Sequence, residues 1–490
     1  MDYSQRLSQR KSKFKSKFNI NNQRNKRFQT CVKISKSKKD DQLMKKRYFL
    51  DEKNYENKLS SLNNLNQMIA NLIQFSEFVE KNEEEIINSL TELRKLLLKI
   101  ENPPIYEMVS SGIFPVMIKL LKQSIEQIQF EVLWILTIFS TESIEELTQN
   151  DLIECLMKLL YSTNEQIQEQ AVWVISNIVA DSPKNRDIII EKGVLSLILN
   201  FLVETNTLQN LRTISWTISN FCNGNPKPDF EKIKIVLPFL KEMIYYVDHE
   251  IILNSSRAFI YLTNSNPEQI QECINLGILP RIVSFLKTSN LKLISNALHI
   301  INNITAGNDE QTQLVINQNS LPVLHRLLSS PHASIRKEVC WILSNITAGN
   351  QSQVISVIET PNLIQKIVEI LNSDEFEVRK EALYSISNIL ANISFEQAKF
   401  LLDLDFISPI CNLLSFNDPP ILFKCLSSIL SILQFGELFY EEKNQFVSFI
   451  EEIGGIEKIR ILENHEISNI NEIAQKIIEK YFNFEEIDNN

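Results

Sequence analysis

The chain has 490 residues, of which 44% are hydrophobic, and it carries 50 Lys/Arg against 60 Asp/Glu, a net charge of −10. Its seven cysteines and five histidines are scattered, without the paired spacings of a disulfide framework or a metal site, and no Gly-rich phosphate loop or nucleophile elbow occurs. We therefore expect buried thiols, no cofactor, no metal and no enzymatic activity. The absence of a long uncharged apolar run predicts no transmembrane helix and no membrane insertion.

The chain begins with a basic segment. Residues 1–50 contain 16 Lys/Arg and 3 Asp/Glu, whereas residues 51–490 contain 34 and 57. The segment is rich in Ser, Asn and Gln and poor in aliphatic residues, which predicts an arm that is disordered when free. A basic arm tethered to an acidic body can dock on that body as an intramolecular competitor. The acidic body would repel phosphate, so nucleic acid is not expected as a partner.

Two further features concern this end of the chain. Residues 51–66 are expected to be a flexible linker that lets the arm fold back. A mitochondrial presequence is an alternative interpretation of the arm, but Lys dominates over Arg there, and Asp40 and Asp41 interrupt the basic run.

The body shows an internal repeat. Trp and Asn recur four residues apart in QAVWVISNI, TISWTISNF and EVCWILSNI, which are the pairs Trp173–Asn177, Trp216–Asn220 and Trp341–Asn345. The first two tryptophans are 43 residues apart, and degenerate positions fill the remaining intervals: Trp134, Arg257, His299 and Tyr384. A period near 42 with two helical patterns per repeat predicts an α-solenoid of the HEAT or armadillo kind over residues 67–482.

We refer to the recurring pairs as the Trp–Asn ladder. Residues four apart share a helix face, so each repeat presents one aromatic ring beside one amide. Aromatic faces attract cations, and an amide can pair with both polar groups of an extended peptide. Ala171, Ile175 and Ile178 already supply a core stripe, and Trp173 and Asn177 fall outside it. The ladder is therefore expected to bind an extended Lys/Arg-rich segment; the alternative is that the tryptophans are core and the asparagines cap loops.

Glycine and proline mark the corners of the repeats. Glycines are expected in the left-handed conformation that closes a helix, and prolines are expected to begin the next one. The positions concerned are Gly112, Gly193, Gly277, Gly307, Gly349, Pro115, Pro280 and Pro322.

Several long stretches, in order, resemble the importin α family, the adaptors that carry nuclear localisation signals to importin β. VKISKSKKDDQLMKKRYF (Val32–Phe49) is similar to the importin-β-binding segment, and the body contains QEQAVWVISNIVAD, NLRTISWTISNFCNGNPKP, RKEVCWILSNITAGNQSQ and EIGGIEKIRILENHE. The resemblance implies an all-α fold: a right-handed α-solenoid of about ten three-helix armadillo repeats. It places the ladder on each third helix, along a concave groove.

The resemblance also implies two signal-binding sites in that groove. The larger site comprises Trp134, Trp173, Asn177, Asp181, Trp216 and Asn220. The smaller site comprises Asn303, Asp309, Glu338, Trp341, Asn345, Glu381 and Asn388. Asp181 corresponds to the aspartate that takes the key lysine of the signal; its alternative role is a helix-end cap in ADSPKN. A compact ammonium suits a single carboxylate at the end of a slot between rings.

The sequence departs from the family pattern at specific ladder positions. Ile138 stands where an asparagine is expected, Arg257 stands where a tryptophan is expected, and His299 and Tyr384 replace other ladder residues. Arg257 adds a positive charge that faces a basic ligand unless it turns away to an acid. We therefore expect signals with one basic cluster to bind less tightly than signals with two.

The termini complete the comparison with the family. Lys36, Lys38 and Lys39 belong to the segment that would face importin β, and Lys45, Lys46 and Arg47 match the cluster that blocks the groove when importin β is absent. The C-terminal region resembles the last repeat, followed by an acidic tail at 483–490, and implies contact with a nuclear export receptor. The resemblance implies shuttling between cytoplasm and nucleus; a β-catenin-type armadillo scaffold that binds other extended peptides is the alternative function.

Overall fold

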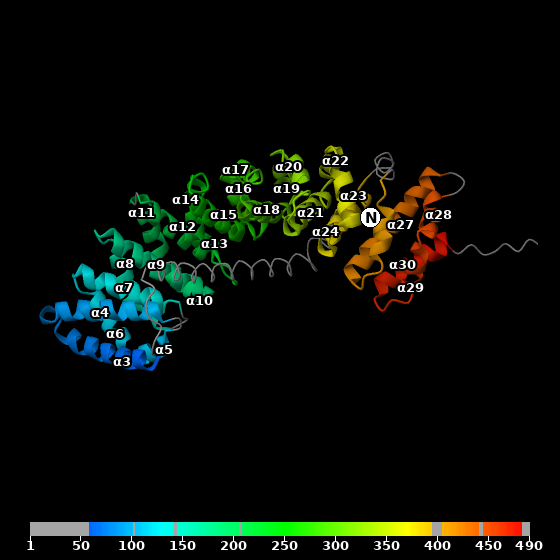
Figure 1. Ribbon diagram of the computed structural model, residues 1–490. Coiled ribbons are helices and arrows are strands. Elements are labelled where there is room, and N and C mark those ends of the chain that lie inside the picture. The colour runs from blue at the N-terminus through cyan, green and yellow to red at the C-terminus, as the bar shows by residue number, and fades with distance from the viewer. Residues whose placement is uncertain are drawn as a thin grey trace, which may run out of the picture. The chain divides into compact units, whose positions relative to one another are not determined.

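The computed structural model describes residues 58–100, 103–141, 145–204, 207–393, 404–440 and 444–482, and every regular element within these ranges is a helix (Figure 1). The six arm cations predicted to act on importin β or the groove, and the acidic tail, lie outside the described residues. Helix α3 (Lys58–Phe75) begins inside the stretch expected to be linker. That expectation was wrong from residue 58 onward, because Leu65, Ile69 and Leu72 recur at helical spacing and are buried.

The chain divides into two compact units, whose described parts run from residue 58 to residue 262 and from residue 263 to residue 482. The first unit contains, in order, α3, η1 (Ser76–Lys81), α4 (Glu83–Lys99), α5 (Ile105–Ser110), α6 (Ile113–Leu121), α7 (Glu126–Phe139), η2 (Glu145–Thr148), α8 (Asn150–Leu159), α9 (Glu165–Asp181), α10 (Pro183–Glu191), α11 (Val194–Glu204), α12 (Leu208–Cys222), α13 (Phe230–Ile233), η3 (Lys234–Val236), α14 (Leu237–Met243) and α15 (His249–Thr263).

The second unit continues the same pattern. It contains α16 (Pro267–Asn275), α17 (Leu279–Phe285), α18 (Leu291–Thr305), α19 (Asp309–Ile316), α20 (Leu321–Leu327), α21 (Ala333–Thr347), α22 (Gln351–Glu359), α23 (Leu363–Ser373), α24 (Phe376–Leu390), α26 (Ile407–Leu413), α27 (Pro419–Phe439), α28 (Gln445–Glu452), α29 (Gly455–Leu462) and α30 (Ser468–Tyr481).

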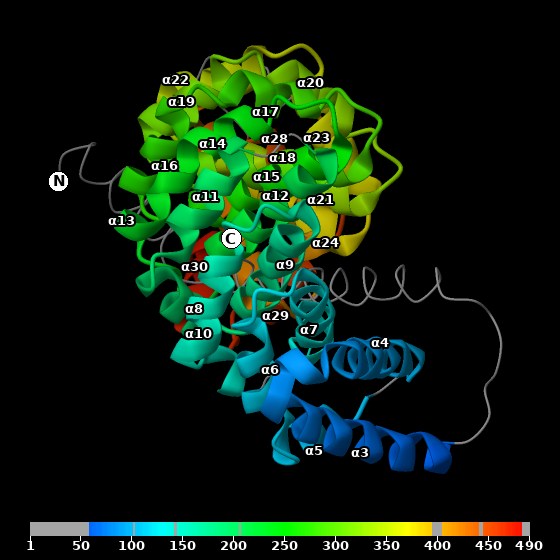
Figure 2. The same cartoon turned by 90° about the vertical axis from the view of Figure 1, so that its left-hand side faces the viewer.

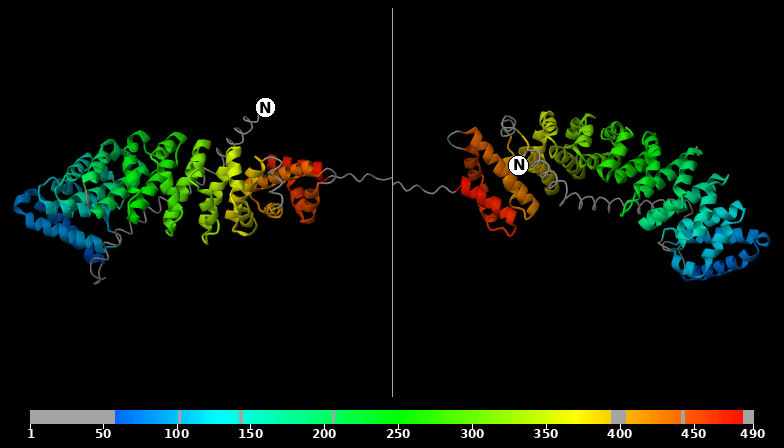
Figure 3. Two further views of the ribbon diagram at one scale, coloured as in Figure 1. Left: turned by 90° about the horizontal axis from the view of Figure 1, so that it is seen from above. Right: turned by 180° about the vertical axis from the view of Figure 1, so that it is seen from behind.

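Each repeat ends in a long third helix, and these helices pack on one another in sequence order. In the first unit α4 packs on α7, α7 on α9 and α9 on α12; in the second α18 packs on α21, α21 on α24, α24 on α27 and α27 on α30. The colours in Figure 3 show that the helices of each unit follow one another in chain order. Helix α3 lies beside α4 at the start of the array (Figure 2). With α15, the described residues contain ten third helices, which confirms the expected all-α array of about ten repeats.

Third helices inside the array, such as α9, are buried on nearly all sides. In α9 every residue from Gln170 to Val179 is buried, because α7, α8, α10 and α12 surround the helix. A helix that is apolar all round is a core helix rather than a surface one. The core of each unit is therefore a row of third helices, covered by the shorter first and second helices.

The corner residues behave as expected at most positions. Gly112, Gly193 and Gly277 have φ of 84°, 76° and 74°, which is the left-handed conformation predicted for them. Pro280 and Pro322 stand at the second residue of α17 and α20, where the missing N–H leaves no helical bond unmade. Pro115 lies in the first turn of α6.

Gly307 and Gly349 are exceptions, because neither has a positive φ. They precede two capping boxes, Asn308–Gln311 and Asn350–Gln353. A Cβ at Gly307 would stand 2.9 Å from the carbonyl oxygen of Ile304 and would overlap the side chain of Gln311. The expectation of a left-handed residue was wrong here; glycine leaves the space that the capping glutamine occupies.

The same glutamines connect neighbouring repeats. Gln311 Nε2 donates to the carbonyl of Pro267 at 2.7 Å, and Gln353 Nε2 donates to the carbonyl of Asp309 at 2.7 Å. Each capping glutamine thus holds its own first helix and the first helix of the preceding repeat at once.

The structure bears on two expectations drawn from composition, one about the cysteines and one about apolar runs. The six cysteines within the described residues are free and buried, as expected, and burial raises the pKa of the Cys273 thiol to about 12. Helix α27 is long and apolar enough by length and composition to cross a membrane, although Lys424 and Glu437 interrupt its apolar stretch. Half of its apolar stretch is buried in the array, where it packs on α24, α26 and α30.

A buried arginine connects α10 to the end of α12. Arg186 is fully buried, and its guanidinium donates to the carbonyl of Asn223 at 2.6 Å and to Asp187 Oδ1 at 2.9 Å. Gly224 follows with φ of 134°, and a Cβ there would overlap Arg186 Nη1. Glycine at this position therefore lets the backbone approach a charged group that has no access to water.

Gly224→Ala should lower the melting temperature more than Gly193→Ala. Both substitutions place alanine at a positive φ, which costs about 1–3 kcal/mol. Only Gly224→Ala also displaces Arg186, since nothing lies within 4 Å of the corresponding position at Gly193. Thermal unfolding followed by circular dichroism measures the two shifts, and equal shifts would contradict the role assigned to Arg186.

Candidate peptide-binding site

The predicted larger site is distributed over three third helices of the first unit. Trp134 lies on α7, the pair Trp173–Asn177 on α9, and the pair Trp216–Asn220 on α12. Trp134 is half-buried, whereas Trp173 and Trp216 are 5% and 1% exposed. The expectation that Trp173 and Asn177 lie outside the buried stripe was wrong, because α9 is enclosed by neighbouring helices. Their role in binding a signal stays a prediction.

The ladder asparagines bond to the repeat before them. In the first unit, Asn177 Nδ2 donates to Ser140 Oγ at 2.8 Å, and Asn220 Nδ2 donates to Ser176 Oγ at 3.0 Å. In α15, Asn254, three residues before the ladder position, donates to Ser215 Oγ at 2.9 Å. These bonds cross from one third helix to the preceding one, so the amides also hold the array together.

The predicted smaller site lies in the second unit and repeats this arrangement. Asn303 Nδ2 donates to Thr263 Oγ1 at 3.2 Å, Asn345 Nδ2 to Asn302 Oδ1 at 2.8 Å, and Asn388 Nδ2 to the carbonyl of Ser344 at 2.9 Å. All three asparagines are buried, and so is Trp341.

The acidic residues of the smaller site have different surroundings. Glu338, on α21, accepts from Asn302 Nδ2 at 3.0 Å and lies 3.4 Å from Nδ1 of His299, the residue at the degenerate ladder position of α18. Glu381 is buried on α24, and Asp309 is the first residue of α19 and is half-buried. The structure therefore places Glu338 within the hydrogen-bond network of the ladder, which sequence spacing does not predict.

Asp181 is the last residue of α9, and it is half-buried. Asn185 Nδ2 donates to Asp181 Oδ2 at 3.0 Å. The capping bond at the start of α10 belongs to Ser182, whose Oγ accepts from the N–H of Asn185 at 3.2 Å. Ser182 thus takes the capping role that was the alternative for Asp181, and the part of Asp181 in binding a signal stays a prediction.

Two ladder rings already carry a cation of the protein itself. Arg94 Cζ lies 5.8 Å from the ring centroid of Trp134, and Lys424 Nζ lies 5.8 Å from that of Tyr384. Arg94 also pairs with the buried Glu131 at 2.6 Å. These rings sit at cation–π distance from a positive charge, the interaction that the ladder was predicted to offer a ligand.

Two of the departures from the family pattern lie on α7 and α15, and their expected effect on signal binding stays a prediction. Ile138 is fully buried on α7 and presents no amide. Arg257, on α15, donates to Asn254 Oδ1 at 3.5 Å, and no carboxylate among the described residues forms an ion pair with it. Its charge is therefore not cancelled by a neighbouring acid in the part of the chain that the structure describes.

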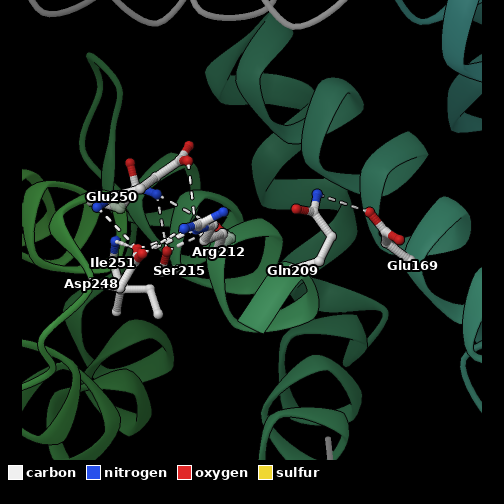
Figure 4. Close-up of polar contacts among 8 residues, drawn as sticks. Glu169, Gln209, Arg212, Ser215, Asp248, Glu250 and Ile251 are labelled. Atoms are coloured by element: carbon white, nitrogen blue, oxygen red, sulfur yellow. Dashed lines mark hydrogen bonds and ion pairs between the residues drawn. The ribbon is translucent and has the colours of Figure 1, made fainter. Parts of the chain in front are cut away.

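Charged pairs along the third helices were not predicted from the sequence. Arg212 Nη2 donates to Asp248 Oδ2 at 2.6 Å, Arg212 Nε lies 4.0 Å from Glu250, and Gln209 donates to Glu169 at 3.2 Å (Figure 4). The hydrogen bonds from Arg212 hold the pKa of Asp248 below its usual value. The partners are about 40 residues apart, so only the repeat period could have indicated them.

Comparison with known proteins adds three family matches. The Armadillo/beta-catenin-like repeat matches residues 140–180, 266–306 and 308–348, and the Atypical Arm repeat matches residues 444–490. The Importin beta binding domain matches residues 10–91, which includes Val32–Phe49 and extends past the expected boundary at residue 50.

Whole-chain relatives agree with these matches. Importin subunit alpha-2 of Arabidopsis thaliana is 35% identical over 490 residues, which cover 94% of this chain and 89% of the relative. Importin subunit alpha-1b of Oryza sativa subsp. japonica is 34% identical over 433 residues, which cover 86% and 81%. The crystal structure of an engineered protein has a TM-score of 0.72 at 20% identity over 85% of this chain and 98% of its own, a likeness of fold alone.

The relatives therefore match the chain through its N-terminal region, its repeats and its last repeat. The resemblance inferred from the sequence is confirmed, and the chain belongs to the importin α family.

Proposed function

We propose that this protein binds Lys/Arg-rich nuclear localisation signals as extended segments along its third helices, at the larger and smaller sites named above. Membership of the importin α family makes it a nuclear import adaptor, and importin β is the partner of its N-terminal domain. The observation that carries the signal-binding proposal is the recurrence of Trp and Asn at one position of α9, α12 and α21.

Charge and chemistry support this assignment. A basic ligand meets a body with 57 acidic and 34 basic residues between positions 51 and 490, so long-range attraction favours the encounter. Indole rings attract the cationic side chains, and the carboxylate of Asp181 offers a single anionic acceptor for one ammonium. The larger site can thus bind several Lys/Arg side chains of a signal without contacts that are specific to its other side chains.

The basic arm supports a self-blocking switch. Residues 45–47 are the cationic cluster Lys45–Lys46–Arg47, tethered to the same acidic body that would receive a cargo signal. A tethered competitor acts at high effective concentration, so it weakens cargo binding until importin β captures the arm. The arm and the cargo signal then compete for the same surface. When the arm occupies that surface, cargo is released and the protein is self-inhibited.

The remaining partners follow from the same cycle. An adaptor that enters the nucleus must return, so the C-terminal repeat, α28 to α30, is proposed to contact a nuclear export receptor, and the protein to shuttle between cytoplasm and nucleus. Neither catalysis, nucleic-acid binding nor membrane insertion forms part of this function. A β-catenin-type scaffold is less well supported, because it would not need an importin-β-binding domain.

Replacing Lys45, Lys46 and Arg47 together by alanine in the full chain should tighten binding of a labelled two-cluster lysine-rich peptide. The physical reason is loss of the intramolecular competitor. Fluorescence anisotropy at moderate salt gives the Kd values, and a matched variant with Lys11, Lys13 and Lys15 replaced by alanine removes the same charge elsewhere in the arm. Equal tightening by both variants would indicate a charge effect and argue against a specific blocking cluster.

Asp181→Lys should weaken binding of the same peptide by about tenfold or more, because a charge-assisted hydrogen bond worth roughly 1.5–3 kcal/mol is lost and a repulsion is added. Asp151→Lys makes the same charge change on α8, where the carboxylate is exposed and pairs with Lys122. An equal loss of affinity in both variants would remove Asp181 from the larger site.

Peptides with one basic cluster should bind less tightly than peptides with two, since Ile138 offers no amide and Arg257 adds a cation. Arg257→Trp should strengthen one-cluster binding by about two- to tenfold, through loss of repulsion and gain of an aromatic face. Arg257→Ala separates the two contributions. Comparable Kd values for both peptide classes on the unmodified chain would contradict the expectation.

A further inference from the structure

The last aromatic ring of the ladder lies against a lysine of the next repeat. The Nζ atom of Lys424, on α27, lies 5.8 Å from the ring centroid of Tyr384, on α24. An ammonium at this distance is attracted by the face of an aromatic ring. Lys424 is half-buried and is the only basic residue of α27. The protein itself therefore places a cation at a ring where the ladder was predicted to receive one from a ligand.

Lys424 stands at a repeat position that carries a carboxylate in the two preceding repeats. Glu338, Glu381 and Lys424 follow one another at intervals of 43 residues on α21, α24 and α27. Each glutamate comes three residues before a ladder ring, Trp341 or Tyr384, and so shares a helix face with that ring. The charge at this repeat position thus changes from negative to positive between α24 and α27.

The ladder itself also ends at α27. One period of 43 residues after Tyr384 the chain has Ser427, and the same interval after Asn388 leads to a second serine, Ser431. Each hydroxyl donates to the carbonyl four residues earlier on α27, at 2.7 Å and 3.0 Å respectively. A serine offers neither an aromatic face nor an amide, so α27 does not continue the surface that we propose for the signal.

A cation of the protein at the last ring changes what a signal can place beside it. A Lys or Arg of the signal that reached past Tyr384 would bring two positive charges together. An Asp or Glu at the same place would instead meet a charge of opposite sign. The interaction between charges a few ångströms apart is felt in binding, with attraction and repulsion of similar size.

We propose that Lys424 ends the smaller site and makes the protein favour signals that carry an acidic residue beside the basic cluster, on the side towards α27. This inference rests on the proposed function and adds a specificity that the ladder residues alone do not give. Glu338 and Glu381 then attract the cations of the cluster, whereas Lys424 acts against a further cation. The change of charge along this repeat position sets how many basic residues the smaller site accepts.

Charge substitutions in the peptide test the proposal on the full chain. The probes are two-cluster lysine-rich peptides in which each residue next to a basic cluster is, in turn, Lys, Gln or Glu. On the unmodified protein, one of these flanking positions should give a Kd about three- to tenfold lower for Glu than for Lys. The arm competes with every probe in the same way, so the ratio of two Kd values does not depend on self-inhibition.

Variants of the protein assign that preference to Lys424. Lys424→Glu continues the series of carboxylates and should reverse the order, so that Lys binds more tightly than Glu at the same flanking position. Lys424→Gln should remove the preference. Lys366→Glu is the matched control and should leave the order unchanged: Lys366 is also half-buried, lies on the second helix α23 and pairs with Glu369 at 2.6 Å. Because each readout is a ratio measured on one variant, partial unfolding does not mimic the effect.

Three outcomes would overturn the role of Lys424. No preference at any flanking position, or a preference that Lys424→Glu leaves unchanged, overturns that role and leaves signal binding intact. An equal reversal in Lys366→Glu also overturns it, since the preference would then reflect the overall charge of the protein. Failure of the unsubstituted peptide to bind the unmodified chain overturns the proposed function and this inference with it.

Discussion

The structure depends on amide hydrogen bonds that pass from the third helices α9, α12, α15, α18, α21 and α24 to the third helix before each of them. Asn177, Asn220 and Asn388 each donate to a hydroxyl or carbonyl of the preceding repeat, at 2.8–3.0 Å. Such bonds lie in a buried, low-dielectric setting, where an unmade partner costs more than the bond itself gains. One residue type thus holds neighbouring repeats in register and also stands at the position where we propose that a signal binds.

This double use constrains the rest of the binding surface. The rings of the ladder are held beside amides that cannot rotate freely, and Glu338 is committed to Asn302 and lies beside His299. Ser182 rather than Asp181 caps α10, and Asp181 accepts a hydrogen bond from Asn185 Nδ2. The body supplies negative charge at long range, whereas only four carboxylates belong to the two predicted sites, namely Asp181, Asp309, Glu338 and Glu381. The basic arm on the same chain is the competitor that we propose for that surface.

The repeat period made most of the fold predictable. Trp173, Asn177 and their counterparts identified the third helices, and Gly112, Gly193 and Gly277 marked true left-handed corners. Packing partners were not predictable, because Ser140 and Ser176 carry no signal in one sequence that they accept from Asn177 and Asn220. The burial of Arg186 depends on a contact with Asn223, about 40 residues away in the sequence. The lack of space for a Cβ at Gly307 depends on Gln311 and Ile304, only a few residues away. Neither composition nor helical spacing reveals these contacts. The start of α3 was not predicted because its sequence is mostly polar and only a narrow stripe of the helix is apolar.

The central claim is that the face carrying the Trp–Asn ladder is the surface that receives the signal. Photo-crosslinking tests it most directly, with a two-cluster lysine-rich peptide that carries a benzophenone at successive positions, followed by peptide mapping of the full chain. Cross-links concentrated on α9, α12, α21 and α24 are the predicted result. Cross-links concentrated on the first and second helices of the repeats, such as α8, α11, α20 and α23, would contradict it.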